Sequence, residues 1–187
     1  MKKLFLSTAL CLTSLLAFAQ EIEYDKSANG ERSIMCKYES VRSMKDKTVF
    51  SVALSAEKNK ENITSYFLSF KTTSGTPITV PEGGKLLIKL KDDTVIELKT
   101  LMEYAGTVRD VHNVNGFVFH DYTIFPAFPI NEAQIKQISG GVKKIRLETI
   151  DGNKDKEFKK DKIGSIIESQ YSLLQNTVNK EGANDDF

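Results

Sequence analysis

The sequence predicts an α+β fold, with a mostly antiparallel β-sheet of about seven to nine strands, one short helix, and a C-terminal amphipathic helix packed on the sheet. Three observations predict it. From residue 34 onward, apolar and polar residues alternate with period two in several runs, which is typical of half-buried strands. Turn-forming Gly, Pro, Asn and Asp residues separate these runs. Near the C-terminus the period lengthens to that of a helix.

The first 19 residues have the pattern of a secretory signal peptide. Lys2 and Lys3 precede an apolar run, residues 4–16, which is followed by the small-x-small sequence of residues 17–19. The run is shorter than the roughly 20 apolar residues that a membrane span needs. We therefore predict cleavage before Gln20, a periplasmic or secreted location, and no membrane span after signal cleavage.

Once the signal peptide (residues 1–19) is removed, the rest of the chain is predicted to form one domain. Residues 20–33 are polar and are expected to be a flexible N-terminal segment. Residues 34–180 are expected to form a single α+β domain, and residues 181–187 a flexible tail.

The charge balance gives no reason to expect a nucleic-acid partner. The chain has 26 Lys and Arg against 25 Asp and Glu, and removal of Lys2 and Lys3 leaves 24 against 25, a net charge of −1. Such a chain has no overall field that attracts polyanions. The lysine-rich residues 153–162 are balanced by acids, so they are expected to form a solvated surface.

Only Cys36 remains after signal cleavage, so no internal disulfide is possible. In the run around it, Ile34, Cys36 and Tyr38 share one face of a strand, which predicts a buried, inert thiol. A lipid anchor on Cys11 is the alternative to a cleaved signal, but bulky Leu10 stands where a lipoprotein signal has a small residue.

The strand register can be derived for the hairpin of residues 85–99. A three-residue loop at residues 91–93 pairs Leu86 with Leu98 and Ile88 with Ile96, and it gives Asp93 a left-handed conformation. A two-residue loop would pair apolar with charged residues. Two earlier strands are expected to point alternate residues inward: Phe50, Val52 and Leu54 in one, and Tyr66, Leu68 and Phe70 in the other.

A second hairpin is predicted around the turn Asn115-Gly116, with arms at residues 108–112 and 117–125. On the second arm, Phe117 and Phe119 face one way, and Val118, His120 and Tyr122 face the other. His112 and His120 are the only histidines, and Asp110 and Asp121 could complete a metal site if the arms pair. Ordinary strand histidines remain the better interpretation, so we expect no metal and no cofactor.

Two helices are expected. Asn131 caps the first, over residues 131–139, with Gln134 completing a capping box and Gly140 closing it. Ile135 and Ile138 face the core, and a strand with Ile145 and Leu147 inward follows. The last helix carries one apolar stripe, weakened by Gly164 in its first turn; the stripe comprises Ile163, Ile166, Ile167, Tyr171, Leu174 and Val178.

No sequence motif indicates catalysis. There is no Gly-x-Ser-x-Gly elbow, and Gly83-Gly84 and Gly140-Gly141 read as turns rather than phosphate loops. Tyr122, Phe125 and Phe128, spaced by prolines, could form a contact surface, but packing against the short helix is the better interpretation.

Three features of the sequence can be compared with known proteins. They are the export signal, the lysine-edged hairpin of residues 85–99, and the strand "GVKKIRLET" followed by a terminal helix. With them the chain resembles small secreted or periplasmic proteins of gut Gram-negative bacteria. The resemblance covers most of the mature chain. It implies export, and it brings no activity and no site residue with it.

The leading hypothesis is an exported, noncatalytic binding or interaction module for a protein or carbohydrate partner. One alternative is a periplasmic hydrolase with a site near His112 and His120, assembled with Asp110 and Asp121. The other is a carrier that holds a small apolar ligand between the sheet and the last helix. The sequence does not identify catalytic or binding residues.

Overall fold

The computed structural model describes residues 21–41, 50–158 and 160–180. The predicted signal peptide, residues 1–19, and the predicted tail, residues 181–187, lie outside this range. The described residues form 14 strands and two helices, so the predicted fold class is confirmed, with more strands than the seven to nine expected. The elements are β1 (Ile22–Ala28), β2 (Glu31–Cys36), β3 (Glu39–Val41), β4 (Phe50–Lys58), β5 (Thr64–Ser74), β6 (Thr79–Val80), β7 (Lys85–Leu90), β8 (Val95–Lys99), β9 (Tyr104–Ala105), β10 (Thr107–Val114), β11 (Phe117–Ile124), β12 (Ala127–Ile130), α1 (Glu132–Ser139), β13 (Val142–Thr149), β14 (Gly152–Glu157) and α2 (Ile163–Val178).

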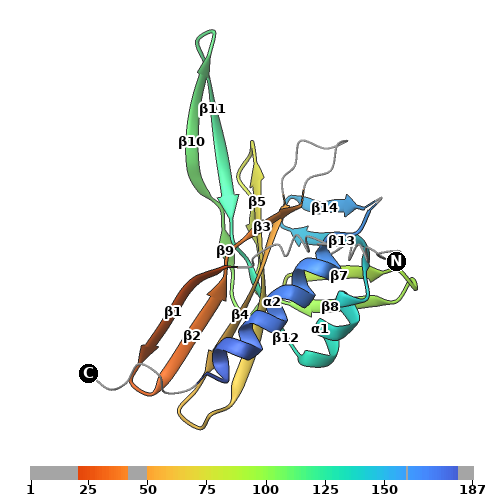
Figure 1. Cartoon of the computed structure of the whole chain (residues 1–187). Coiled ribbons are helices and arrows are strands. Elements are labelled where there is room, and N and C mark those ends of the chain that lie inside the picture. Colours follow the sequence, from red (N-terminus) through yellow and green to blue (C-terminus); the bar gives the residue numbers. More distant parts are fainter. Residues whose placement is uncertain (1–20, 42–49, 159, 181–187) are drawn as a thin grey trace, which may run out of the picture.

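The strands form two main antiparallel sheets (Figure 1). The larger follows the order β1-β2-β4-β5-β11-β10, with β12 added to β5 and β3 added to β4. The smaller follows the order β14-β13-β7-β8. Helix α2 packs on β4 and β2, and α1 packs on α2. One apolar core joins both sheets and both helices. No helix among the described residues is long and apolar enough to cross a membrane.

The register derived for residues 85–99 is confirmed. Leu86 pairs with Leu98 and Ile88 with Ile96, and all four side chains are buried. Asp93 has a φ of 67°, in the left-handed region. Its carboxylate accepts hydrogen bonds from Lys143 and Lys89, and these lower the pKa of Asp93 to about 2. The capping box of α1 is also confirmed, because Gln134 N donates to Asn131 and Asn131 N donates to Gln134.

Residues 20–33, expected to be flexible, instead contain β1 and the start of β2. The two strands pair antiparallel from Ile22 to Cys36 around the turn Asn29-Gly30. Both turn residues have positive φ, 55° and 78°, which is the geometry of a tight hairpin turn. Arg32 donates to both carboxylate oxygens of Asp25, at 2.9 and 2.7 Å. The sequence signal was the Asn-Gly pair, which sequence reasoning overlooked.

Strand β4 was expected to be half-buried, but both of its faces are covered. Phe50, Val52 and Leu54 are buried as predicted, and so are the intervening residues Ser51 and Ala53. The strand lies in the middle of the larger sheet, between β2 and β5, with α2 on one face. The residues on its other face, Ser51, Ala53 and Ser55, are small and also buried. This strand is therefore a central part of the core.

The described residues of 153–162 are mostly exposed, as predicted, but β14 contains one exception, because Lys156 is buried. Lys156 pairs with buried Ile145 of β13 and is only 1% exposed. Its Nζ lies 5.9 Å from the centre of the Phe50 ring. The neighbouring Asp155 points the other way and accepts hydrogen bonds from Arg146. Alternation along a paired strand separates the two side chains, and net composition could not reveal it.

Helix α2 buries the predicted stripe, except for Ile166, which is half-buried. Gly164 was predicted to weaken the first turn of this helix, but the structure gives it a packing role. A Cβ at Gly164 would lie 2.9 Å from the carbonyl oxygen of Ser139 and 2.8 Å from Asp161, so the glycine permits close contact with the end of α1. Gln170 also lies in the buried face and is fully buried, which sequence reasoning missed.

Candidate functional site

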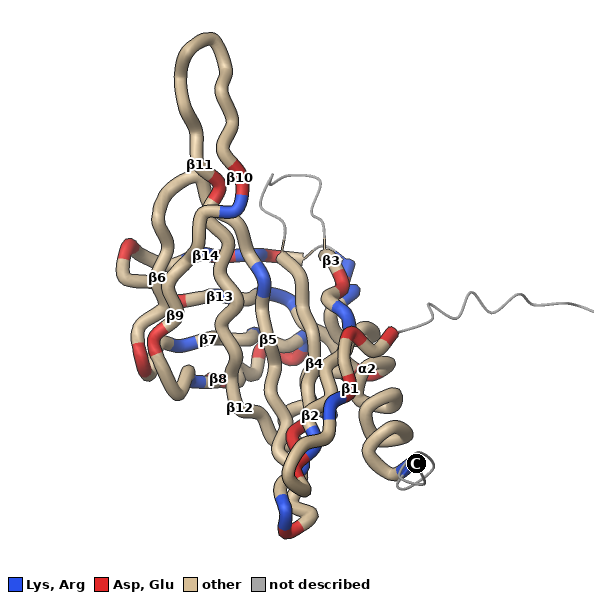
Figure 2. The backbone as a smooth tube through the Cα atoms, turned by 90° about the vertical axis from the view of Figure 1, so that its left-hand side faces the viewer, with Lys and Arg blue, Asp and Glu red and all other residues tan. Residues whose placement is uncertain are grey.

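The hairpin of β10 and β11 projects from the body of the protein (Figures 1 and 2). Only Tyr122, Thr123 and Ile124 of β11 pair with β5. Strand β10 is the end strand in the order of the larger sheet. Beyond this junction, each arm is therefore bonded to the other arm alone among the described strands.

The turn of this hairpin is the predicted Asn115-Gly116. Asn115 has a φ of 52° and Gly116 a φ of 85°, and Val114 pairs with Phe117 across them. Asn113 accepts a hydrogen bond from Gly116 N at 3.1 Å. Positive φ at both central residues matches the right-handed twist of the two strands. The turn and the alternating faces of β11 are confirmed.

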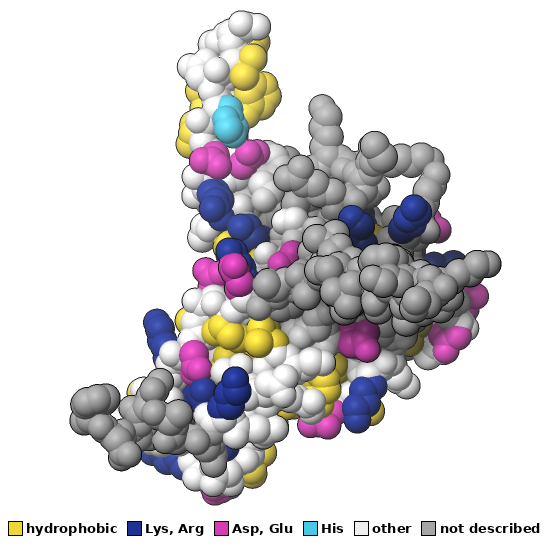
Figure 3. Space-filling model, in the orientation of Figure 1, with side chains coloured by type: hydrophobic (Ala, Val, Ile, Leu, Met, Phe, Trp, Pro, Cys, Tyr) yellow, Lys and Arg dark blue, Asp and Glu magenta, His cyan; other side chains and the backbone are white. Residues whose placement is uncertain are grey.

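The projecting part of the hairpin is apolar on both faces. Six large hydrophobic side chains of the hairpin are at least about half exposed, with Val108 beside the junction with β5 and the other five beyond it: Val108 49%, Val111 60%, Val114 54%, Phe117 70%, Val118 56% and Phe119 55%. In the space-filling view, hydrophobic side chains gather on this hairpin above a histidine and acidic groups (Figure 3). Residues 111–120 contain no Lys, Arg, Asp or Glu. The sequence signal for this surface was a stretch without charges, in which apolar residues at both odd and even positions place apolar side chains on both faces of the hairpin.

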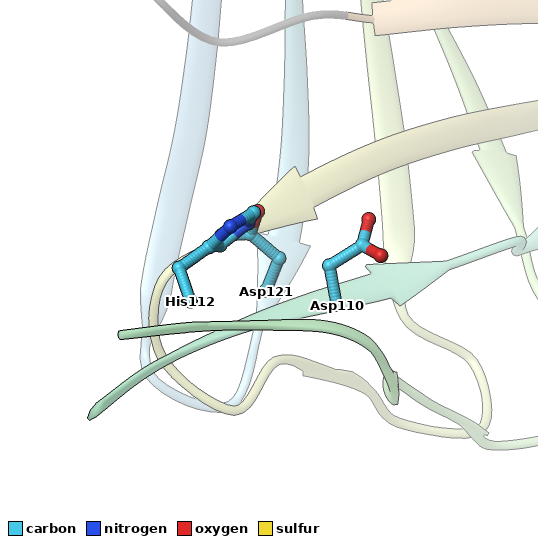
Figure 4. Close-up of side chains that lie close together, drawn as sticks. All are labelled: Asp110, His112 and Asp121. Carbon is cyan, nitrogen blue, oxygen red and sulfur yellow. The ribbon is translucent and has the colours of Figure 1, made fainter. Parts of the chain in front are cut away.

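At the base of the hairpin, three polar side chains lie on one face (Figure 4). Asp110 pairs directly with Asp121, and His112 is two residues further along β10. His112 Nε2 lies 3.0 Å from Asp121 Oδ2. One donor atom from each of Asp110, His112 and Asp121 lies within 4.8 Å of the others. We call these three residues the Asp-His-Asp cluster.

The register separates the two histidines. His120 pairs with Val111, so its side chain lies on the opposite face from His112, which pairs with Phe119. The His120 ring is 6.4 Å from the Tyr122 ring on that face. The hypothetical hydrolase site of Asp110, His112, His120 and Asp121 is therefore not one site. The structure brings three of its members together and places His120 apart.

The aromatic residues at 122–128 do not form one contact surface. Phe128 is fully buried and packs edge-to-face on Phe70. Phe125 is 41% exposed and packs edge-to-face on Tyr38, with Lys71 Nζ 5.7 Å from its ring centre. Phe128 is therefore packed in the core rather than on a contact surface, but its ring partner is Phe70 of β5 and not a residue of the short helix.

Cys36 is fully buried, as predicted. Its Sγ lies 3.7 Å from the carbonyl oxygen of Gln170. Burial raises the pKa of the Cys36 thiol to about 12. A thiol in this state is not a nucleophile near neutral pH, because the thiolate is the reactive form.

Comparison with known proteins found no matching family model, no similar curated protein and no similar solved structure.

Proposed function

We propose that this protein is an exported, noncatalytic binding module and that the β10–β11 hairpin is its contact element. The observation that carries the proposal is a projecting hairpin with exposed apolar side chains on both faces. A soluble monomer gains nothing from exposing Phe117 and Phe119, because burying each ring would contribute about 1.5–3 kcal/mol. Binding a partner would recover that free energy.

The open edges of the hairpin support strand addition as the mode of contact. Backbone groups at the outer edge of β10 meet no described strand, and the same holds for β11 before Tyr122. Natural sheets usually protect such edges with lysine, proline or inward charges. Residues 111–120 contain none of these. A partner strand could therefore add to either edge, with apolar side chains filling pockets on both faces.

The chemistry of the hairpin favours a protein partner over a carbohydrate. Four of its six exposed hydrophobic side chains are valines, which contribute apolar area but no polar group. Phe117 and Phe119 provide the aromatic area that is enriched in protein–protein contacts. We infer that the partner is a protein that presents a sheet edge beside an apolar surface.

Export is part of the proposal and rests on the signal-peptide pattern of residues 1–19. The noncatalytic part rests on two observations. His112 and His120 face opposite sides of the hairpin, and the thiol of Cys36 is buried. Neither arrangement offers a nucleophile paired with a base.

A photocrosslinking experiment tests the proposal. The photoreactive amino acid p-benzoylphenylalanine replaces Phe117, and the purified protein is irradiated in an envelope extract of the native host. We expect a discrete adduct, resolved by electrophoresis and identified by mass spectrometry, because Phe117 is the most exposed apolar side chain of the contact element at 70%. An adduct of twice the chain mass would identify the partner as a second copy.

The matched control carries the same amino acid in place of Ile63. Ile63 is 57% exposed and lies between β4 and β5, whose turn is at the opposite end of the molecule from the hairpin (Figure 1). The same adducts from both positions, or none from position 117, would contradict the proposal, since general stickiness would then account for any capture.

A further inference from the structure

The Asp-His-Asp cluster places two carboxylates directly opposite each other. Asp110 and Asp121 are cross-strand partners, and like charges in this position destabilise a strand pair. Among the described residues, the hydrogen bond of the His112 side chain is to Asp121. The Asp110 carboxylate makes no ion pair or hydrogen bond with the described residues. A cation between the two carboxylates would convert this repulsion into attraction.

The donor types and their spacing fit a metal ion. Zinc takes imidazole nitrogen and carboxylate oxygen at about 2.0–2.2 Å, so donors on one tetrahedral ion lie roughly 3.3–3.6 Å apart. The three donor atoms already lie within 4.8 Å of one another. His112 and Asp121 have side-chain exposures of 55% and 41%, so rotation into place meets little obstruction.

We propose that Asp110, His112 and Asp121 bind a divalent first-row transition metal ion such as zinc. The imidazole favours such an ion over calcium or magnesium, which prefer oxygen ligands alone. Three protein ligands leave at least one coordination position for water or for a donor from another molecule. His120, on the other face, takes no part.

This site does not depend on the contact element having a partner. It requires only the register of β10 and β11 near the base of the hairpin. Failure of the crosslinking experiment would leave it standing, and its own failure would leave the proposed contact element unaffected. Under this proposal His112 is a metal ligand, and His120 is an ordinary strand histidine.

The test uses purified protein without a histidine tag, freed of metal by a chelator and then dialysed. Because the chain has two histidines, the imidazole nitrogens give two sets of signals in a ¹H–¹⁵N correlation spectrum. During titration with zinc chloride, the signals of His112 should shift or broaden until one equivalent is bound. The signals of His120 should stay in place.

The variants distinguish a built site from random surface binding. His112→Ala and Asp110→Asn should each weaken zinc affinity by about tenfold or more in calorimetry. His120→Ala, on the opposite face of the same hairpin, is the matched control and should change it less than about twofold. Asp110→Asn removes a ligand that bonds to no described residue without zinc, so the hairpin should keep its fold, checked by circular dichroism. Equal weakening by His112→Ala and His120→Ala, or joint movement of both histidine signals, would overturn the proposal.

Discussion

Replacing Ile167 by Ala is expected to lower the free energy of unfolding by about 2–5 kcal/mol, the range for loss of a buried large aliphatic side chain. Ile167 is fully buried in the second turn of α2, the helix that packs on β4 and β2. Three methyl or methylene groups leave the core, and the rigid strands beneath cannot close the space. Urea unfolding of the purified protein measures the loss.

Glu168→Ala is the matched control, on the next residue of the same helix. Glu168 is exposed, so the change should alter the free energy of unfolding by less than about 0.5 kcal/mol. Equal, small effects at the two positions would mean that α2 does not pack on the sheet as described. The apolar stripe of α2 would then become the leading candidate for the contact surface.

Gln170→Leu is expected to cost about 2–4 kcal/mol, although leucine has nearly the same volume and is more apolar. Gln170 Oε1 accepts from Leu54 N at 2.8 Å, and Nε2 donates to the Lys37 carbonyl oxygen at 3.0 Å. Strand β2 leaves β4 at Met35, and β3 joins it at Glu39. The side-chain amide of Gln170 thus fills the gap between these two strands.

The cost arises because leucine leaves the buried Leu54 N–H without an acceptor and the part-buried Lys37 carbonyl oxygen without this donor, at up to about 1–3 kcal/mol for each group. Gln175→Leu on the same helix is the control, since Gln175 is half-buried and, among the described residues, its amide donates to the hydroxyl of Tyr171 and bridges no strands. Hydrogen exchange supplies a second reading, in which the Leu54 amide should exchange faster in Gln170→Leu. Unchanged protection of that amide and equal stability of the two variants would show that Gln170 does not bridge the strands.

Local patterns predicted the parts of the fold that depend on neighbouring residues. The register of Leu86 with Leu98 follows from the apolar face, the turn from Asn115-Gly116, and the helix start from Asn131. The bridge made by Gln170 could not be predicted in this way. It depends on a break between β2 and β3, which lie more than 100 residues earlier in the chain.

The candidate site was partly predictable. A two-residue turn at Asn115-Gly116 sets Asp110 opposite Asp121 by simple counting along the two arms. The same counting places His112 and His120 on opposite faces. The exposure of the hairpin was not predictable, because it depends on where β11 stops pairing with β5, at Tyr122. The sequence of a charge-free strand is the same whether the strand projects into solvent or lies in the middle of a sheet.

A shortened hairpin tests most directly whether β10 and β11 serve contact rather than folding. Replacing residues 111–120 by Asn-Gly joins Asp110 to Asp121, which pair in the same register as Val114 and Phe117. Because the removed side chains are exposed, the free energy of unfolding should change by less than about 1 kcal/mol. The decisive measurement is a competition experiment. The protein with the photoreactive amino acid at position 117 is irradiated in the presence of an excess of either the full chain or the shortened chain, both without that amino acid, and the yield of the adduct is measured. The full chain should suppress the adduct and the shortened chain should not. Equal suppression by both would contradict the assignment of the hairpin as the contact element.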